Sequence, residues 1–154
     1  MTASDTRRAL KSAARFYAVQ ARFQMEAGDQ TVEAVRREFE EWRIGATVDE
    51  QEMTDADITL FRRLLDDAVN WQGRIDQLTD HALVVKWPID RLDPTLRALF
   101  RAAGAELFHT DTPPRVVINE YVEITKAFFP EGREARFVNA VLVHMARDVR
   151  PEAF

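Results

Sequence analysis

Residues that end helices are few in this chain and lie far apart. Its 154 residues contain five Gly and six Pro, and the segments between them carry apolar residues three or four positions apart, the spacing of one helix face. No segment alternates apolar and polar residues for long enough to indicate a strand. The sequence therefore predicts an all-α fold of about six or seven helices. We expect a single domain over 1–154, with an ordered helical core over about 5–148.

Capping residues and prolines give the expected helix boundaries. The clearest start signal is Asp93 followed by Pro94, a capping side chain with proline in the first turn. The longest apolar stripe runs over 54–83, where Gly73 is a point at which the helix can bend. The polar, acidic segment 45–53 predicts an exposed loop, and Trp87-Pro88-Ile89 predicts a turn. The expected helices span 5–27, 32–43, 54–83, 94–109, 114–129 and 133–148.

The composition argues against several classes of protein. No apolar run approaches the roughly 20 residues of a membrane span, and the N-terminus lacks the apolar stretch of a signal peptide. The chain has no Cys, which excludes disulfides and thiolate metal sites. His81, His109 and His144 show no metal-ligand spacing, and no phosphate-binding loop or nucleophile motif accompanies the carboxylates. We therefore expect a cytoplasmic protein without catalytic activity, metal or cofactor.

Charge is distributed unevenly along the chain, whose net charge is -5. Residues 1–26 carry five basic and two acidic side chains, whereas residues 27–57 carry ten acidic and three basic ones. The local field matters more to a polyanion than the total, because charges beyond about 10 Å are largely screened at physiological salt. A basic N-terminal face is therefore compatible with RNA binding of modest affinity.

Three motifs lie in an order and at a spacing that point to one family. Ala18-Val19-Gln20-Ala21 lies in the first expected helix, Val117-Ile118-Asn119-Glu120 lies in the fifth, and Phe137-Val138-Asn139 opens the sixth. Phe100-Arg101-Ala102-Ala103 is a fourth match and lies between them. With these motifs, the chain resembles the NusB family over nearly its whole length.

The resemblance implies a compact helical fold of two small subdomains and a non-catalytic role in transcription antitermination. A member of this family pairs with NusE, a small-subunit ribosomal protein, and binds the boxA element of nascent ribosomal RNA transcripts. The pair acts within the RNA polymerase antitermination complex. Some relatives form homodimers that hide the RNA surface, and the sequence leaves the oligomeric state open. A similar domain occurs ahead of a methyltransferase domain in some ribosomal RNA cytosine methyltransferases, but 154 residues leave no room for a catalytic domain.

The chain also departs from the family pattern. Ala140 replaces a glycine, Val143 stands where an acid often follows, and Ala105 replaces an aromatic residue. Ser12, Ala13 and Ala14 dilute the N-terminal arginine cluster. These changes favour an alternative reading, in which the chain is a NusB-fold protein-interaction module with weakened RNA affinity.

The candidate RNA contacts come from both ends of the chain. Arg8, Lys11 and Arg15 share a helical face, where they would bind phosphates or form an ordinary solvated surface. Phe137 would stack on a base or pack in the core. Arg101 would reach RNA or form a buried ion pair with Glu106 or Glu120. The full candidate set is Arg7, Arg8, Lys11, Arg15, Gln20, Arg101, Arg133, Arg136 and Phe137.

A second surface is expected to face NusE. Phe23, Glu26 and the segment 90–97 are its candidates, with a core position as the alternative for Phe23. We expect Asn119 and Glu120 to hydrogen-bond a neighbouring helix end and so to maintain the fold.

Overall fold

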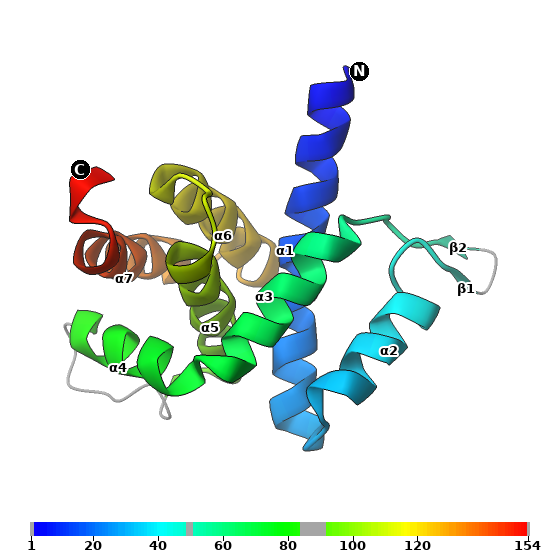
Figure 1. Ribbon diagram of the computed structural model, residues 1–154, viewed down its shortest axis with the longest axis horizontal. Coiled ribbons are helices and arrows are strands. Elements are labelled where there is room, and N and C mark those ends of the chain that lie inside the picture. Colours follow the sequence, from blue (N-terminus) through cyan, green and yellow to red (C-terminus); the bar gives the residue numbers. More distant parts are fainter. Residues whose placement is uncertain (1, 49–50, 84–91, 154) are drawn as a thin grey trace.

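The computed structural model describes residues 2–48, 51–83 and 92–153, and the all-α prediction is confirmed (Figure 1). The expected turn at Trp87-Pro88-Ile89 lies outside the described residues. No described helix is long and apolar enough to cross a membrane. Within these ranges the chain forms α1 (Ala3–Gly28), α2 (Val32–Trp42), α3 (Ile58–Asn70), α4 (Gln72–Ala82), α5 (Pro94–His109), α6 (Pro114–Phe128), α7 (Glu134–Val149) and a short 3-10 helix, η2 (Pro151–Ala153).

The segment expected to form one long helix over 54–83 is two helices, which corrects the prediction. The Asp57 side chain accepts a hydrogen bond from the Leu60 amide at 3.0 Å and caps α3, so residues 54–57 lie outside the helix. The break falls at Trp71 rather than at Gly73. Local propensity does not require this break. It lets α3 pack on α1 and α5 while α4 turns to pack on α5 and α7.

The polar segment between α2 and α3 is not entirely loop. Thr47–Val48 (β1) and Gln51–Glu52 (β2) form a minimal antiparallel pair in which Thr47 lies opposite Glu52. Gly45 precedes the pair with a positive φ of 67°, a backbone conformation that suits glycine. Two residues per strand are too few for a period-two pattern, so this strand pair could not be predicted from the sequence.

Helix α5 is the centre of the molecule, with α1, α2 and α3 on one side and α4, α6 and α7 on the other (Figure 1). Apart from Arg101, its residues 96–107 are buried. Small side chains at Ala102, Ala103 and Ala105 let neighbouring helices approach closely. Gly104 is the extreme case, because a Cβ atom there would lie 2.5 Å from Cγ2 of the buried Ile75 on α4.

Candidate RNA surface and apolar pocket

The N-terminal turns of α1 project beyond the rest of the fold (Figure 1) and carry Arg7, Arg8 and Lys11 on their surface. Thr2 and Asp5 cap this end reciprocally, with the Asp5 amide donating to Thr2 Oγ1 at 3.0 Å. None of the three cations forms an ion pair within the part of the chain that the structure describes. They are therefore available to an external anion.

Arg15 lies where α1 enters the body, and its prediction as an RNA contact is wrong. Its guanidinium is buried, with Nε and Nη2 donating to the Glu106 carboxylate at 2.9 and 2.8 Å and Nη1 donating to Glu120 at 2.6 Å. Tyr121 Oη donates to Glu106 at 3.0 Å, and Ser12 Oγ donates to Glu120 at 2.6 Å. Helical spacing placed Arg15 on the face of Arg8 and Lys11, but the body of the protein covers that face from Arg15 onward.

The buried hydrogen-bond network changes the pKa values of Arg15 and Tyr121. Burial by itself lowers the pKa of Arg15, but hydrogen bonds and charge from Glu106 outweigh it and hold that pKa above its ordinary value. Burial, assisted by the nearby Glu106 charge, raises the pKa of Tyr121 well above its ordinary value. Arg15 therefore stays charged and Tyr121 stays a hydrogen-bond donor. The predicted structural role of Glu120 agrees with these contacts, whereas Asn119 is exposed.

Arg101 is also withdrawn from solvent, so the structure does not support it as an RNA contact. Its side chain is 11% exposed, and Nε and Nη2 donate to the Asp76 carboxylate of α4 at 3.1 and 2.9 Å. The predicted alternative for Arg101 was an ion pair with Glu106 or Glu120. An ion pair does form, but with Asp76, because Glu106 and Glu120 both pair with Arg15. Glu26, expected to face a partner, accepts from Nε of Arg97 at 3.1 Å and lies 4.0 Å from Arg101. Its carboxylate ties α1 to α5.

Arg22 is a buried cation that was not among the predicted site residues. Its Nη2 donates to Gln72 Oε1 at 2.7 Å, its Nε has no hydrogen-bond partner, and no described carboxylate lies within 4.0 Å. Burial, with the like charge of Arg101, lowers its pKa to about 10. Arg15 and Arg22 are seven residues apart and share one helix face, and that spacing was the available signal.

At the start of α7, Arg133 and Arg136 are exposed and Phe137 is half-buried. The Phe137 ring packs edge-to-face on Phe100 with centroids 6.1 Å apart. This contact agrees with the core alternative for Phe137 and leaves only part of the ring to an external base.

An open groove of about 920 Å³ runs between α1, α3 and α6. Arg8 and Lys11 stand on one wall, and Asn119 and Glu123 stand on another. Acidic side chains in the walls offset much of the basic charge. An RNA backbone in this groove would therefore meet both signs of charge.

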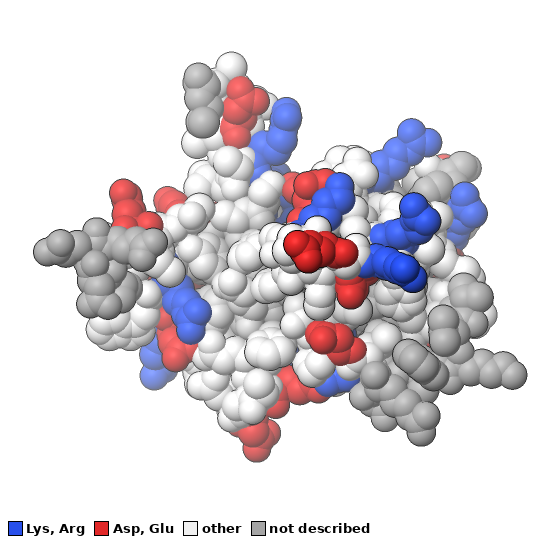
Figure 2. Space-filling view, turned by 180° about the vertical axis from the view of Figure 1, so that it is seen from behind, with Lys and Arg blue, Asp and Glu red and all other residues white. Residues whose placement is uncertain are grey.

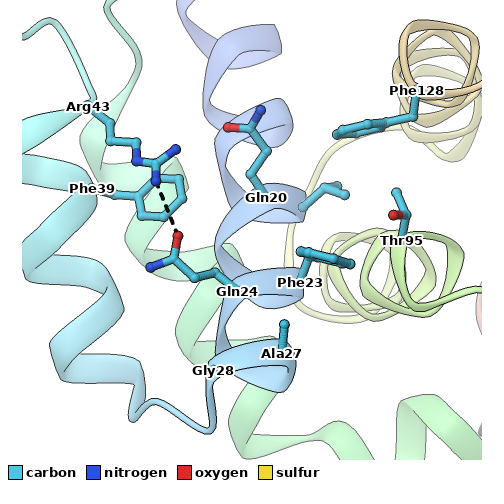
Figure 3. A pocket seen from close by; sticks show the side chains of 10 residues that line it. Gln20, Phe23, Gln24, Ala27, Gly28, Phe39, Arg43, Thr95 and Phe128 are labelled. Carbon is cyan, nitrogen blue, oxygen red and sulfur yellow. Dashed lines mark hydrogen bonds between the residues drawn. The ribbon is translucent and has the colours of Figure 1, made fainter. Parts of the chain in front are cut away.

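A separate apolar pocket of about 480 Å³ lies between α1, α2, α5 and α6 (Figure 3). Phe23, which is 38% exposed, and Phe128 face it, and the Phe128 ring also stacks on Phe16 with centroids 5.1 Å apart. Gln20 was predicted to contact RNA, whereas Phe23 and the segment 90–97 were predicted to contact NusE. The pocket brings Gln20 and Phe23 together with Thr95 from that segment. Its lining residues are Val19, Gln20, Phe23, Gln24, Ala27, Gly28, Phe39, Arg43, Thr95 and Phe128.

One face of the molecule has an uncharged patch bordered by charged side chains. Figure 2 views the molecule from behind Figure 1 and shows a patch without charged side chains left of centre, below the projecting end of α1, with acidic and basic side chains around it. An uncharged surface suits an apolar protein contact better than a polyanion.

Comparison with known proteins assigns this geometry to a family. The NusB family model matches residues 12–147. The transcription antitermination protein NusB of Maricaulis maris is 45% identical over 152 residues, 98% of this chain and 94% of that protein. Among solved structures, T. maritima NusB has a TM-score of 0.70 at 28% identity, covering 93% of this chain and 95% of that one. Antitermination factor NusB in complex with NusE and dsRNA has a TM-score of 0.69 at 25% identity, covering 89% and 96%. This chain therefore belongs to the NusB family of transcription antitermination factors, which are not enzymes.

Proposed function

We propose that this protein is an RNA-binding antitermination factor of the bacterial cytoplasm that, together with NusE, binds boxA-type RNA in nascent ribosomal RNA transcripts. It acts as an adaptor to the RNA polymerase antitermination complex. The observation that carries the proposal is the projecting, basic end of α1, in a chain similar to a NusB solved with NusE and dsRNA.

RNA contact is assigned to the exposed cations Arg7, Arg8 and Lys11, with Arg133 and Arg136 as secondary contacts. Three cations that each neutralise one phosphate of single-stranded RNA give a slope of about -2 in log K against log salt, and five give about -3.5. This is a modest electrostatic contribution. Base preference then has to come from stacking and from the polar side chains of the groove.

NusE contact is assigned to the apolar pocket. Phe23 and Phe128 provide a hydrophobic centre, while Gln20, Gln24 and Arg43 provide polar groups around it. An apolar side chain of a partner seated between these rings is the kind of anchor that supplies most of the affinity of a protein interface.

The alternative function, an interaction module with weakened RNA affinity, rests on a specific observation. Four arginines that could have served RNA are buried or paired within the protein: Arg15, Arg22, Arg97 and Arg101. Under this alternative, NusE supplies most of the affinity of the complex for RNA.

The test is a titration of boxA RNA and of scrambled RNA, with and without NusE, at two salt concentrations. We expect a boxA preference that NusE strengthens. A variant with Arg7, Arg8 and Lys11 replaced by Ala should lose affinity and reduce the salt slope by about 2. The charge-matched control replaces three exposed arginines of α2, α3 and α4, namely Arg37, Arg62 and Arg74.

The outcomes of this titration distinguish the RNA-binding factor from the interaction module. No boxA preference with or without NusE contradicts RNA reading. Retained NusE binding, with RNA affinity unchanged in the α1 variant, favours the interaction module.

A further inference from the structure

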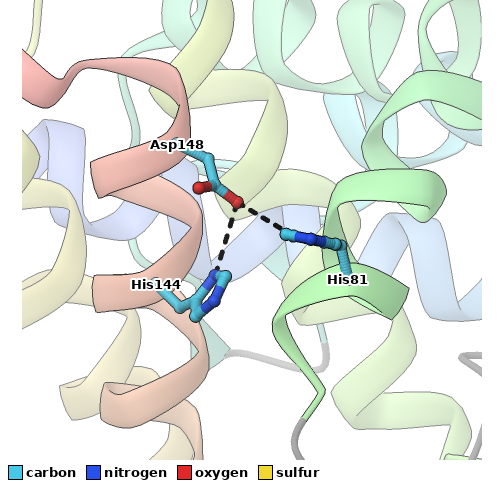
Figure 4. Close-up of side chains that lie close together, drawn as sticks. All are labelled: His81, His144 and Asp148. Atoms are coloured by element: carbon cyan, nitrogen blue, oxygen red, sulfur yellow. Dashed lines mark hydrogen bonds and ion pairs between the residues drawn. The ribbon is translucent and has the colours of Figure 1, made fainter.

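The ends of α4 and α7 bring together two histidines that lie 63 positions apart in the sequence. His81 is in the last turn of α4, and His144 and Asp148 are one turn apart near the end of α7. The three side chains converge (Figure 4), with the imidazole rings 5.4 Å apart between centroids. The sequence predicted no metal site here because the two imidazoles lie on different helices.

Both imidazoles approach the same carboxylate oxygen. Nδ1 of His81 lies 3.3 Å from Oδ2 of Asp148, and Nδ1 of His144 lies 3.4 Å from that oxygen. Two ligand atoms bound to one tetrahedral Zn²⁺ at about 2.0–2.1 Å are about 3.3–3.4 Å apart. The two contacts therefore already have the separation that a shared tetrahedral ion requires.

The remaining separation is also small. One donor atom from each of the three residues lies within 4.8 Å of the other two. The His81 side chain is 72% exposed, so a change of rotamer can bring its ring nitrogen closer without disturbing the core.

A second observation points to a ligand at the same place. Nδ1 of His144 is shielded from solvent and has no hydrogen-bond partner of acceptable geometry, although Asp148 is nearby. The His144 side chain as a whole is 43% exposed, so an ion can reach the ring, and the shielded nitrogen has a carboxylate beside it but makes no hydrogen bond. A metal ion would use the lone pair of this nitrogen.

The helix ends strengthen the case for a cation. α4 ends at Ala82 and α7 ends at Val149, so His81 and Asp148 both lie in the last turn of a helix. The C-terminal end of a helix carries partial negative charge and favours a positive ion.

We propose that His81, His144 and Asp148 bind a divalent transition-metal ion, with Zn²⁺ as the physiological candidate. Two imidazoles and one carboxylate suit Zn²⁺, Co²⁺ or Ni²⁺ rather than Mg²⁺ or Ca²⁺, which prefer oxygen ligands. The ion joins the end of α4 to the end of α7, and water completes its coordination. The site is independent of the RNA surface and of the apolar pocket.

The test uses the full chain freed of metal by chelator and titrated with ZnCl₂ by calorimetry, and with CoCl₂ by visible absorption. We expect one saturable ion per chain and a tetrahedral Co²⁺ spectrum. His81→Ala and His144→Ala should each weaken binding by roughly tenfold or more, because one of three protein ligands is lost.

The remaining histidine is the matched control. His109 lies at the end of α5, where its ring packs on Trp71 with centroids 4.8 Å apart, so His109→Ala should bind Zn²⁺ like the wild type. At one fixed concentration, Zn²⁺ should raise the Tm of the wild type and of His109→Ala more than that of His81→Ala. No saturable binding, or equal binding by His81→Ala and His109→Ala, overturns the proposal. Because His81 is on the surface, its replacement leaves the fold intact, which circular dichroism verifies.

Discussion

Arg15 of α1 and Glu106 of α5 form a two-pronged ion pair inside the protein, with side chains only 3% and 0% exposed. The pair fixes the longest helix to the central one. Arg22, two turns further along the same face of α1, is buried without a carboxylate partner among the described residues. The two arginines provide opposite tests of what a buried charge does to stability.

Replacing Arg15 should be strongly destabilising. Arg15→Met leaves Glu106 buried without a compensating charge, and we expect the free energy of unfolding to fall by about 3–5 kcal/mol. Urea denaturation followed by circular dichroism measures the change. A loss below about 1 kcal/mol would show that solvent reaches Glu106 and that the pair is not a buried one.

Replacing Arg22 should be tolerated. A folded-state pKa of about 10 lies well below the ordinary value of an arginine, so folding penalises the charged form, by about 3 kcal/mol at neutral pH. We expect Arg22→Met to unfold with a free energy equal to that of the wild type or up to about 2 kcal/mol higher. Above pH 10 the unfolded chain still holds the proton that the folded chain releases, so the advantage of the variant should shrink as pH rises. A clearly less stable Arg22→Met protein at pH 7 would contradict this account.

Two glycines should respond oppositely to the same substitution. Gly104→Ala pushes a methyl group against Ile75, a stiff β-branched side chain in the core, and should lower stability by about 1–3 kcal/mol. Gly73→Ala meets no atom within 4 Å and lies in a helix, so it should raise stability by about 0.5 kcal/mol. Thermal unfolding of both variants checks the sign of each change, and the same sign in both would rule out the packing argument.

The apolar pocket predicts a selective defect in protein binding. Phe23→Ala should weaken NusE binding by roughly tenfold or more, equivalent to a loss of at least about 1.4 kcal/mol, with RNA affinity in the absence of NusE unchanged. Trp42→Ala is the control, because Trp42 is a 65% exposed aromatic residue on α2 that does not line the pocket. Calorimetric titration with NusE compares them. Equal effects of the two substitutions would place the NusE contact elsewhere.

Local signals in the sequence predicted much of the fold. Asp93 caps α5 with Pro94 in its first turn, as expected, because cap chemistry depends only on adjacent residues. The break at Trp71 was missed because it depends on where α4 packs, and no residue next to Trp71 encodes that.

The sequence predicted the residues of the candidate site less well than it predicted the fold. Periodicity identifies which residues share a face but not where along a helix that face becomes buried, so Arg8 and Arg15 looked equivalent. The partners of Arg101 and Glu26 lie on other helices, and pairing between helices depends on tertiary structure. The same limit kept His81 and His144 apart, because only the packing of α4 on α7 brings them together.

Helix α1 runs without interruption from its cap at Thr2 to Gly28. At about 1.5 Å per residue, its 26 residues form a rod of about 39 Å, and Arg8 and Phe23 lie about 22 Å apart along it. The proposed RNA contact and the proposed protein contact are therefore mounted on one stiff element with no joint between them. A partner bound at the pocket therefore fixes the direction of the basic end of α1. RNA that binds there has no further entropy cost for orienting that end of the helix.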